Sequence, residues 1–128
     1  MKLLLDTHVL IWLVEGSNSL SQPAQQAIED DGNSLHLSIA SLWEMTIKMT
    51  LGKLQLGMPI ELIVESYLIP TGIEILPIHL NHLLVLRDLP LHHRDPFDRL
   101  LISQAQSERL TLISGDRVFG NYPVQILW

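Results

Sequence analysis

Four acidic residues stand beside predicted strand ends or in the helices that adjoin them: Asp6, Glu44, Asp98 and Asp116. Carboxylates a few ångströms apart raise one another's pKa, so a cluster of them is unfavourable unless positive charge neutralises it. Hard divalent cations such as Mg²⁺ and Mn²⁺ prefer oxygen ligands and are commonly held by carboxylates together with a phosphate. If the fold brings the four side chains to one edge of a sheet, they form a divalent-metal site.

Each acid taken alone also has a simpler structural interpretation. Asp6 can cap the helix that follows it, and Glu44 can pair with Lys48 one helical turn later. The other two suit the first turn of a helix and a Ser-Gly-Asp turn. Asp95, which precedes a proline, is better suited to a turn or a helix N-cap than to a metal site.

The histidines and tryptophans near these acids are expected to have structural parts. Adjacent histidines rarely share a metal ion and no third ligand has suitable spacing, so His92 and His93 are expected to be loop residues. His8 is expected to pack at a helix start or to contact the site indirectly, rather than to act as a base. Trp12 and Trp43 lie on apolar helix faces and are expected in the core.

The elements that must position the acids alternate along the chain. Strands are expected at residues 2–5, 35–37, 73–77, 110–113 and 124–127, and helices at residues 6–16, 22–31, 39–50, 60–68, 79–89 and 97–109. This alternation predicts right-handed βαβ crossovers. The expected fold class is therefore α/β, a three-layer α/β/α sandwich with a mainly parallel sheet, in one domain spanning residues 1–128.

Composition narrows the possible functions. With 47% hydrophobic but only 5% aromatic residues, the core must be built from aliphatic side chains, which suits buried parallel strands. The absence of cysteine excludes disulfides and thiolate metal sites. The net charge of -6 argues against coating nucleic acid by bulk electrostatics. No apolar run approaches the ~18 residues of a membrane span, so we expect a cytoplasmic protein without a membrane partner.

Four stretches of the sequence resemble the PIN-domain family, and within it the VapC-type toxins of prokaryotic toxin-antitoxin pairs. They are LLLDTHVLIWL, SIASLWEMTIKMTLGKL, HHRDPFDRLLISQA and LISGD, which follow in the family's order across nearly the whole chain. The resemblance implies a PIN-like fold and a Mg²⁺- or Mn²⁺-dependent ribonuclease. Its acids would be Asp6, Glu44, Asp98 and Asp116, with Thr7 and Ser114 supporting the site. Asp98 is chosen within DPFD because it stands before the LLISQA helix as the family's third acid does, and Asp95 remains the alternative.

The resemblance implies metal-assisted hydrolysis of RNA phosphodiester bonds, with Glu44 either binding metal or orienting the attacking water. Four basic residues are expected to position the RNA backbone: Lys48, Arg94, Arg99 and Arg117. The resemblance to VapC-type toxins further implies a homodimer whose activity is inhibited by a small antitoxin protein. The apolar segments 60–68 and 12–14 are candidates for the antitoxin contact, with core packing as the alternative.

Two other functions compete with this interpretation. A catalytically silent PIN-fold module could keep the acids for binding an antitoxin or a nucleic acid, although the presence of all four acids argues against it. A phosphotransfer domain of receiver type also uses strand-end aspartates. Such a domain needs a lysine at the end of a late strand, and this sequence has none there.

Overall fold

The computed structural model describes all 128 residues, and its centre is a five-stranded parallel sheet. In the order in which they lie side by side, the strands are β3 (Glu74–Leu76), β2 (Ser34–Ser38), β1 (Lys2–Leu5), β4 (Thr111–Ile113) and β5 (Ile126–Leu127). Leu5 pairs with Leu37 of β2 on one side and with Ile113 of β4 on the other. The carboxyl end of β1 therefore meets those of both neighbours.

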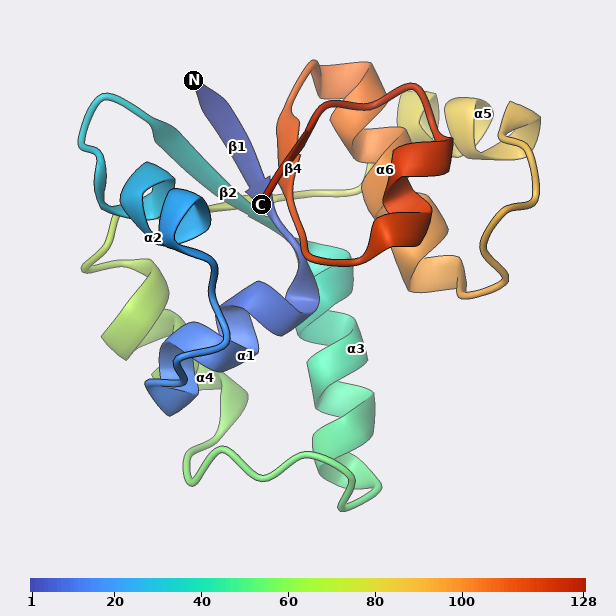
Figure 1. Cartoon of the computed structure of the whole chain (residues 1–128). Coiled ribbons are helices and arrows are strands. Elements are labelled where there is room, and N and C mark those ends of the chain that lie inside the picture. Colours follow the sequence, from blue (N-terminus) through green and yellow to red (C-terminus); the bar gives the residue numbers. More distant parts are fainter.

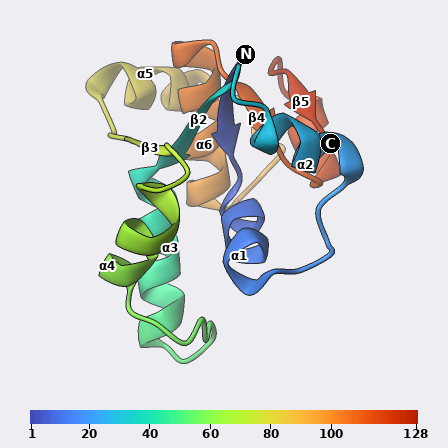
Figure 2. The ribbon, with the colours of Figure 1, turned by 90° about the vertical axis from the view of Figure 1, so that its left-hand side faces the viewer.

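Six α-helices surround this sheet: α1 (Thr7–Glu15), α2 (Gln22–Glu29), α3 (Ile39–Thr50), α4 (Ile60–Ile63), α5 (Leu80–Asp88) and α6 (Pro96–Glu108). Figure 1 shows α1 and α2 on one side of the strands and α5 and α6 on the other. The α3 helix extends beyond the carboxyl ends of the strands, with α4 beside it (Figures 1 and 2). None of these helices has the length and apolar character needed to cross a membrane.

Side-chain alternation along β1 explains the three layers. Leu3 and Leu5 point to the hydrophobic cluster that includes Val9 of α1, whereas Leu4 points to a second cluster with Leu101 of α6. Both faces of the sheet are thus covered, as parallel sheets require. The predicted α/β sandwich is confirmed, and the sheet is parallel throughout.

Local capping signals account for most element boundaries. Ser38 begins α3, where its Oγ accepts a 3.0 Å hydrogen bond from the backbone N–H of Ala40. Gly16 ends α1 in the left-handed region with φ 66°, a conformation that glycine adopts without strain.

The helix predicted over residues 60–68 is the element that differs most. It is α-helical only to Ile63 and continues over Val64–Leu68 as a π-helix, closed by a 3.0 Å bond from the N–H of Ile69 to the carbonyl of Val64. The wider turn allows Ile63 and Leu68, five residues apart, both to be buried in the core.

Candidate metal centre

The four predicted acids come from four different elements near the carboxyl end of the sheet. Asp6 directly follows β1, Asp116 follows β4, Glu44 lies in α3 after β2, and Asp98 lies in the first turn of α6. The chain leaves β1 toward β2 on one side, while β4 lies on the other. Ligand sites of parallel α/β sheets lie at such a divergence, outside the carboxyl ends of the strands.

Asp6 is a buried carboxylate held by a hydroxyl. It is only 6% exposed, and the Oγ of Ser114 donates a 2.8 Å hydrogen bond to its Oδ2. The backbone N–H of Asp116 in turn donates to Ser114 Oγ at 3.1 Å. Burial raises the pKa of Asp6 above its ordinary value, and the bond from Ser114 opposes that rise. Asp6 occupies the N-cap of α1, but its side chain makes no capping hydrogen bond, so capping does not explain the carboxylate.

Glu44 forms the expected pair with Lys48 and keeps one oxygen free. Lys48 Nζ lies 2.8 Å from Glu44 Oε2, as the one-turn spacing predicts. The other oxygen, Oε1, is buried and has no hydrogen-bond partner. A buried carboxylate oxygen without a hydrogen-bond partner costs free energy. The ion pair with Lys48 therefore explains the position of Oε2 but not the burial of Oε1. A bound cation would satisfy Oε1.

Asp98 shows how close the acids are to one another. The pKa of its carboxyl is raised to about 7, first by burial and then by the negative charges of Asp95, Asp6, Glu44 and Asp116. Such mutual repulsion is relieved when a divalent cation binds among the carboxylates. The oxygen-rich donor set and the unpartnered Glu44 oxygen therefore fit Mg²⁺ or Mn²⁺.

The two aspartates of DPFD have different surroundings. Asp95 is the N-cap of α6, and its Oδ1 accepts hydrogen bonds from the backbone N–H groups of Phe97 at 2.9 Å and Asp98 at 3.4 Å. The Asp98 side chain is 22% exposed, and its Oδ2 lies 3.9 Å from the Nε2 of His93. This arrangement favours Asp98 over Asp95 as the third acid of the centre.

His93 joins the centre, although sequence reasoning placed it among loop residues. Its Nε2 lies 3.3 Å from Asp116 Oδ2 and 3.9 Å from Asp98 Oδ2, and the three potential ligand atoms lie within 4.8 Å of one another. The two adjacent histidines do not form a pair. His92 instead is exposed and packs edge-on against Tyr122, so only one of the two faces the acids.

The two predicted supporting hydroxyls do different things. Ser114 binds Asp6 directly, as described above. The Oγ1 of Thr7 donates a buried 2.9 Å hydrogen bond to Ser41 Oγ and so ties α1 to α3. The α1 helix follows Asp6 and α3 carries Glu44. Thr7 therefore holds these two helices together and does not contact a carboxylate.

The four predicted basic residues are not equivalent. Arg94 and Arg117 are exposed, and Lys48 is half-buried beside Glu44. The guanidinium of Arg99 donates to three backbone carbonyls at 2.9–3.4 Å, those of Pro90, Leu86 and Leu89. Arg99 therefore holds the end of α5, and its predicted contact with RNA remains a prediction.

Trp43 corrects a prediction, because it lies at the surface and not in the core. It is 57% exposed, and its ring packs edge-on against Phe97 with centroids 5.0 Å apart. The reason is that α3 extends past the sheet, so its wide apolar arc is only partly covered. Trp12 is half-buried and packs against Trp128 at 5.8 Å.

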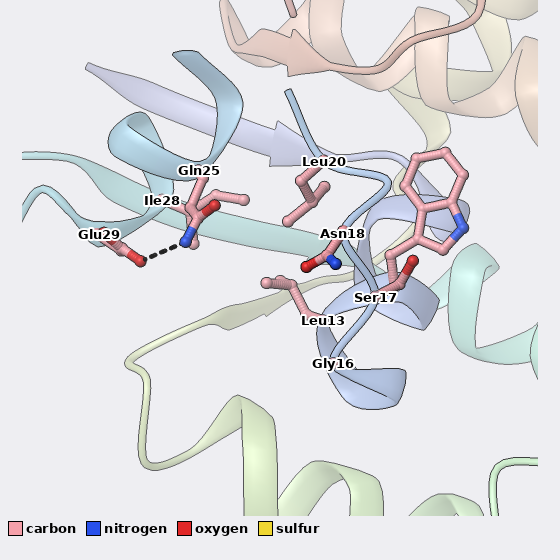
Figure 3. Close-up of a pocket in the computed structure, with 9 residues that line it drawn as sticks. Leu13, Gly16, Ser17, Asn18, Leu20, Gln25, Ile28 and Glu29 are labelled. Atoms are coloured by element: carbon pink, nitrogen blue, oxygen red, sulfur yellow. Dashed lines mark hydrogen bonds between the residues drawn. The ribbon is translucent and has the colours of Figure 1, made fainter. Parts of the chain in front are cut away.

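Two surface hollows differ in their relation to the acids. The hollow between α1 and α2 is lined by Leu13, Leu20 and other residues, and Gln25 Nε2 donates to Glu29 Oε1 at 3.1 Å there (Figure 3). None of the four acids lines it. A groove between α3 and the start of α6 does reach the centre, and it is lined by Glu44, Ile47, Lys48, Arg94, Asp95, Pro96 and Phe97.

Comparison with known proteins identifies the family. The fold resembles chains of VapBC2 from Rickettsia felis bound to a promoter DNA fragment (TM-score 0.74, 16% identity, 98% of this chain and 97% of that chain covered) and of FitAcB from Neisseria gonorrhoeae (0.64, 18%, 97% and 95%). It also resembles a chain of VapBC-1 from nontypeable Haemophilus influenzae (0.64, 18%, 98% and 96%). No curated protein sequence gives a significant match. The PIN domain family model matches residues 3–124, and this chain therefore belongs to the PIN domain family.

Proposed function

We propose that this protein is a metal-dependent endoribonuclease that hydrolyses RNA phosphodiester bonds and acts as the toxin of a type II toxin-antitoxin pair. The observation that carries the proposal is the group of acids contributed by four separate elements, in which the pKa of Asp98 is raised to about 7. A structural role alone gives no reason to keep such repulsion in the fold.

The side chains have distinct parts in the proposed reaction. A bound Mg²⁺ or Mn²⁺ supplies charge neutralisation at the scissile phosphate and lowers the pKa of an attacking water. Asp6, Asp98 and Asp116 hold the cation, and the free Oε1 of Glu44 either joins them or orients the water. Ser114 keeps the Asp6 carboxylate in position. No side chain becomes covalently attached to the substrate.

The groove between α3 and α6 is the proposed path of the RNA. Lys48 and Arg94 line it and provide positive charge for the phosphate backbone, and the exposed Arg117 lies beyond Asp116. Trp43 exposes more than half of its surface next to this groove. Because proteins recognise RNA largely through unpaired bases that stack on side chains, single-stranded RNA is the expected substrate.

Cleavage of an end-labelled single-stranded RNA by the purified protein tests the activity. We expect cleavage with Mn²⁺ and none with EDTA, and loss of cleavage in Asp98→Asn and Glu44→Gln. Asp95→Asn is the matched control, since asparagine also caps helices and α6 keeps its N-cap. Identical products with Mn²⁺ and EDTA would overturn the proposal. RNA binding without cleavage in any metal would favour the competing silent binding module.

The proposed partner is a small antitoxin, and the proposed form is a cytoplasmic homodimer. The solved complexes that share this fold are VapBC and FitAcB assemblies. Both segments considered for the contact pack partly on the core: Leu13 and Val14 lie against it, and so do Ile60 and Val64. Only the 60–68 segment has an exposed large apolar side chain, Leu62 at 43%, and it is therefore the better candidate. Growth arrest on expression, relieved by co-expression of a neighbouring short gene, is the expected result.

A further inference from the structure

We propose that His93 is a ligand of the metal centre, binding the cation through Nε2 between the carboxylates of Asp98 and Asp116. This inference rests on the proposed metal-dependent function and adds a nitrogen donor to an otherwise oxygen-only site. The three ligand atoms come from the loop before α6, from α6 itself and from the turn after β4.

The distances suit three ligands of one ion. Ligands about 2.1 Å from a shared octahedral cation lie about 3.0 Å apart when adjacent and about 4.2 Å apart when opposite. His93 Nε2 lies 3.3 Å from Asp116 Oδ2 and 3.9 Å from Asp98 Oδ2, within that range. A strong charge-assisted hydrogen bond between nitrogen and carboxylate is shorter, about 2.7–2.9 Å. Without metal, His93 Nε2 and Asp116 Oδ2 form a hydrogen bond at 3.3 Å, and a shared cation would replace this long contact.

The imidazole ring is held in this orientation by packing. It stacks on Phe119 with ring centroids 4.9 Å apart and on Tyr122 at 5.8 Å. The hydroxyl of Tyr122 accepts hydrogen bonds from the backbone N–H groups of both His92 and His93, at 3.0 and 2.8 Å. The loop backbone and the ring plane are thus both constrained, which lowers the cost of binding a ligand at Nε2.

Burial supplies an independent observation. The His93 side chain is 9% exposed, and its Nδ1 is buried without a hydrogen-bond partner. An apolar ring would fill the same space without the cost of an unpaired nitrogen, so packing alone does not explain a histidine here. The opposite ring nitrogen, Nε2, faces the carboxylates of Asp98 and Asp116, where a bound cation would give the histidine a role that packing does not.

A nitrogen ligand changes which metal the centre favours. Imidazole binds transition metals well, whereas Mg²⁺ prefers oxygen donors only. We therefore expect His93 to raise the affinity for Mn²⁺ relative to Mg²⁺. This difference separates a ligand from a residue that merely packs or positions Asp116.

Pulsed electron paramagnetic resonance of Mn²⁺ bound to the full chain tests the assignment, because a coordinated imidazole gives a ¹⁴N coupling. We expect this coupling in the wild type and in the matched control His92→Gln, and its loss in His93→Gln. In titrations, His93→Gln should raise the Kd for Mn²⁺ by at least about tenfold and the Kd for Mg²⁺ by much less.

Several outcomes would overturn the assignment. They are a ¹⁴N coupling that persists in His93→Gln, its absence from the Mn²⁺-loaded wild type, and an unchanged ratio of the two Kd values. If His93→Gln does not fold, the double variant His8→Gln/His92→Gln removes a histidine that acts on the Asp6 carboxyl as well as the loop neighbour of His93. Loss of the coupling there would also overturn it. A ¹⁴N coupling without RNA cleavage would contradict the proposed nuclease activity and still support His93 as a ligand. Cleavage without the coupling would support the nuclease activity and exclude His93 as a ligand.

Discussion

Replacing Asp98 with Asn tests the electrostatics of the centre directly. Burial and neighbouring carboxylates raise the pKa of Asp98 from 3.8 to about 7, so the folded protein binds this proton more tightly than the unfolded chain does. Stability contributed by such a group is present at low pH and is lost as the pH rises through that interval. Above about pH 7, the ionised carboxylate of Asp98 destabilises the metal-free protein, whereas the neutral amide of the Asp98→Asn variant does not.

The size of the effect follows from the pKa and the exposure. A rise from 3.8 to about 7 corresponds to at most about 4 kcal/mol. Because the side chain is 22% exposed, solvent screens part of the repulsion, and we expect Asp98→Asn to stabilise the metal-free protein by about 1–2 kcal/mol at about pH 8. For a chain of this size that raises Tm by about 4–8 °C.

Metal binding should stabilise the wild type and have little effect on Asp98→Asn. A cation at about 100 times its Kd stabilises the wild type by about 2.7 kcal/mol, while Asp98→Asn should lose most of this gain. The assay is thermal unfolding followed by circular dichroism at about pH 5 and about pH 8, with EDTA or with excess Mn²⁺. Asp95→Asn, which keeps the helix cap, should retain most of the Mn²⁺ stabilisation.

A lower metal-free Tm for Asp98→Asn at the higher pH would refute the electrostatic reasoning. A full Mn²⁺ shift in that variant, together with a lost shift in Asp95→Asn, would transfer the ligand role from Asp98 to Asp95.

Three further predictions concern neighbouring side chains. Ser114→Ala removes the hydrogen bond that lowers the pKa of Asp6, so the acidic limb of the pH profile of RNA cleavage should move to higher pH. The rate of cleavage should also fall, by an amount equivalent to roughly 1.5–3 kcal/mol, the free energy of a hydrogen bond to a charged group. An unchanged pH profile would contradict the role of Ser114. Gly115→Ala should destabilise by about 1–3 kcal/mol in urea unfolding, because a Cβ there would lie 2.8 Å from the Trp128 ring, and Trp128→Ala in the same chain should relieve most of this cost. Trp43→Ala should leave Tm nearly unchanged and lower kcat/KM for single-stranded RNA by a free energy of about 1–3 kcal/mol, whereas equal losses on RNA and on a small phosphodiester would exclude base stacking.

The amino-acid sequence alone determined the alternation of elements and their ends. Leu3 to Leu5, followed by Asp6, predicts a buried strand and a turn into a helix, and Ser38 predicts the start of α3, because these signals act between residues close in the chain. The parallel α/β architecture follows from this alternation. The sequence also placed Asp6, Asp98 and Asp116 beside recognisable element boundaries, whereas Glu44 lies in the interior of α3.

Only the tertiary structure decided which side chains meet. The pKa of Asp98 depends on burial and on the charges of Asp6, Glu44 and Asp116, which come from distant parts of the chain. His93 likewise reaches Asp116 across more than twenty residues. Local patterns carry no information about such distances. For the same reason Trp43 is exposed although it lies on an apolar face of its helix, because α3 extends past the sheet. The guanidinium of Arg99 likewise donates its hydrogen bonds to backbone carbonyls at the end of α5. Burial and charge are properties of neighbours in space, and those neighbours exist only after the strands have paired.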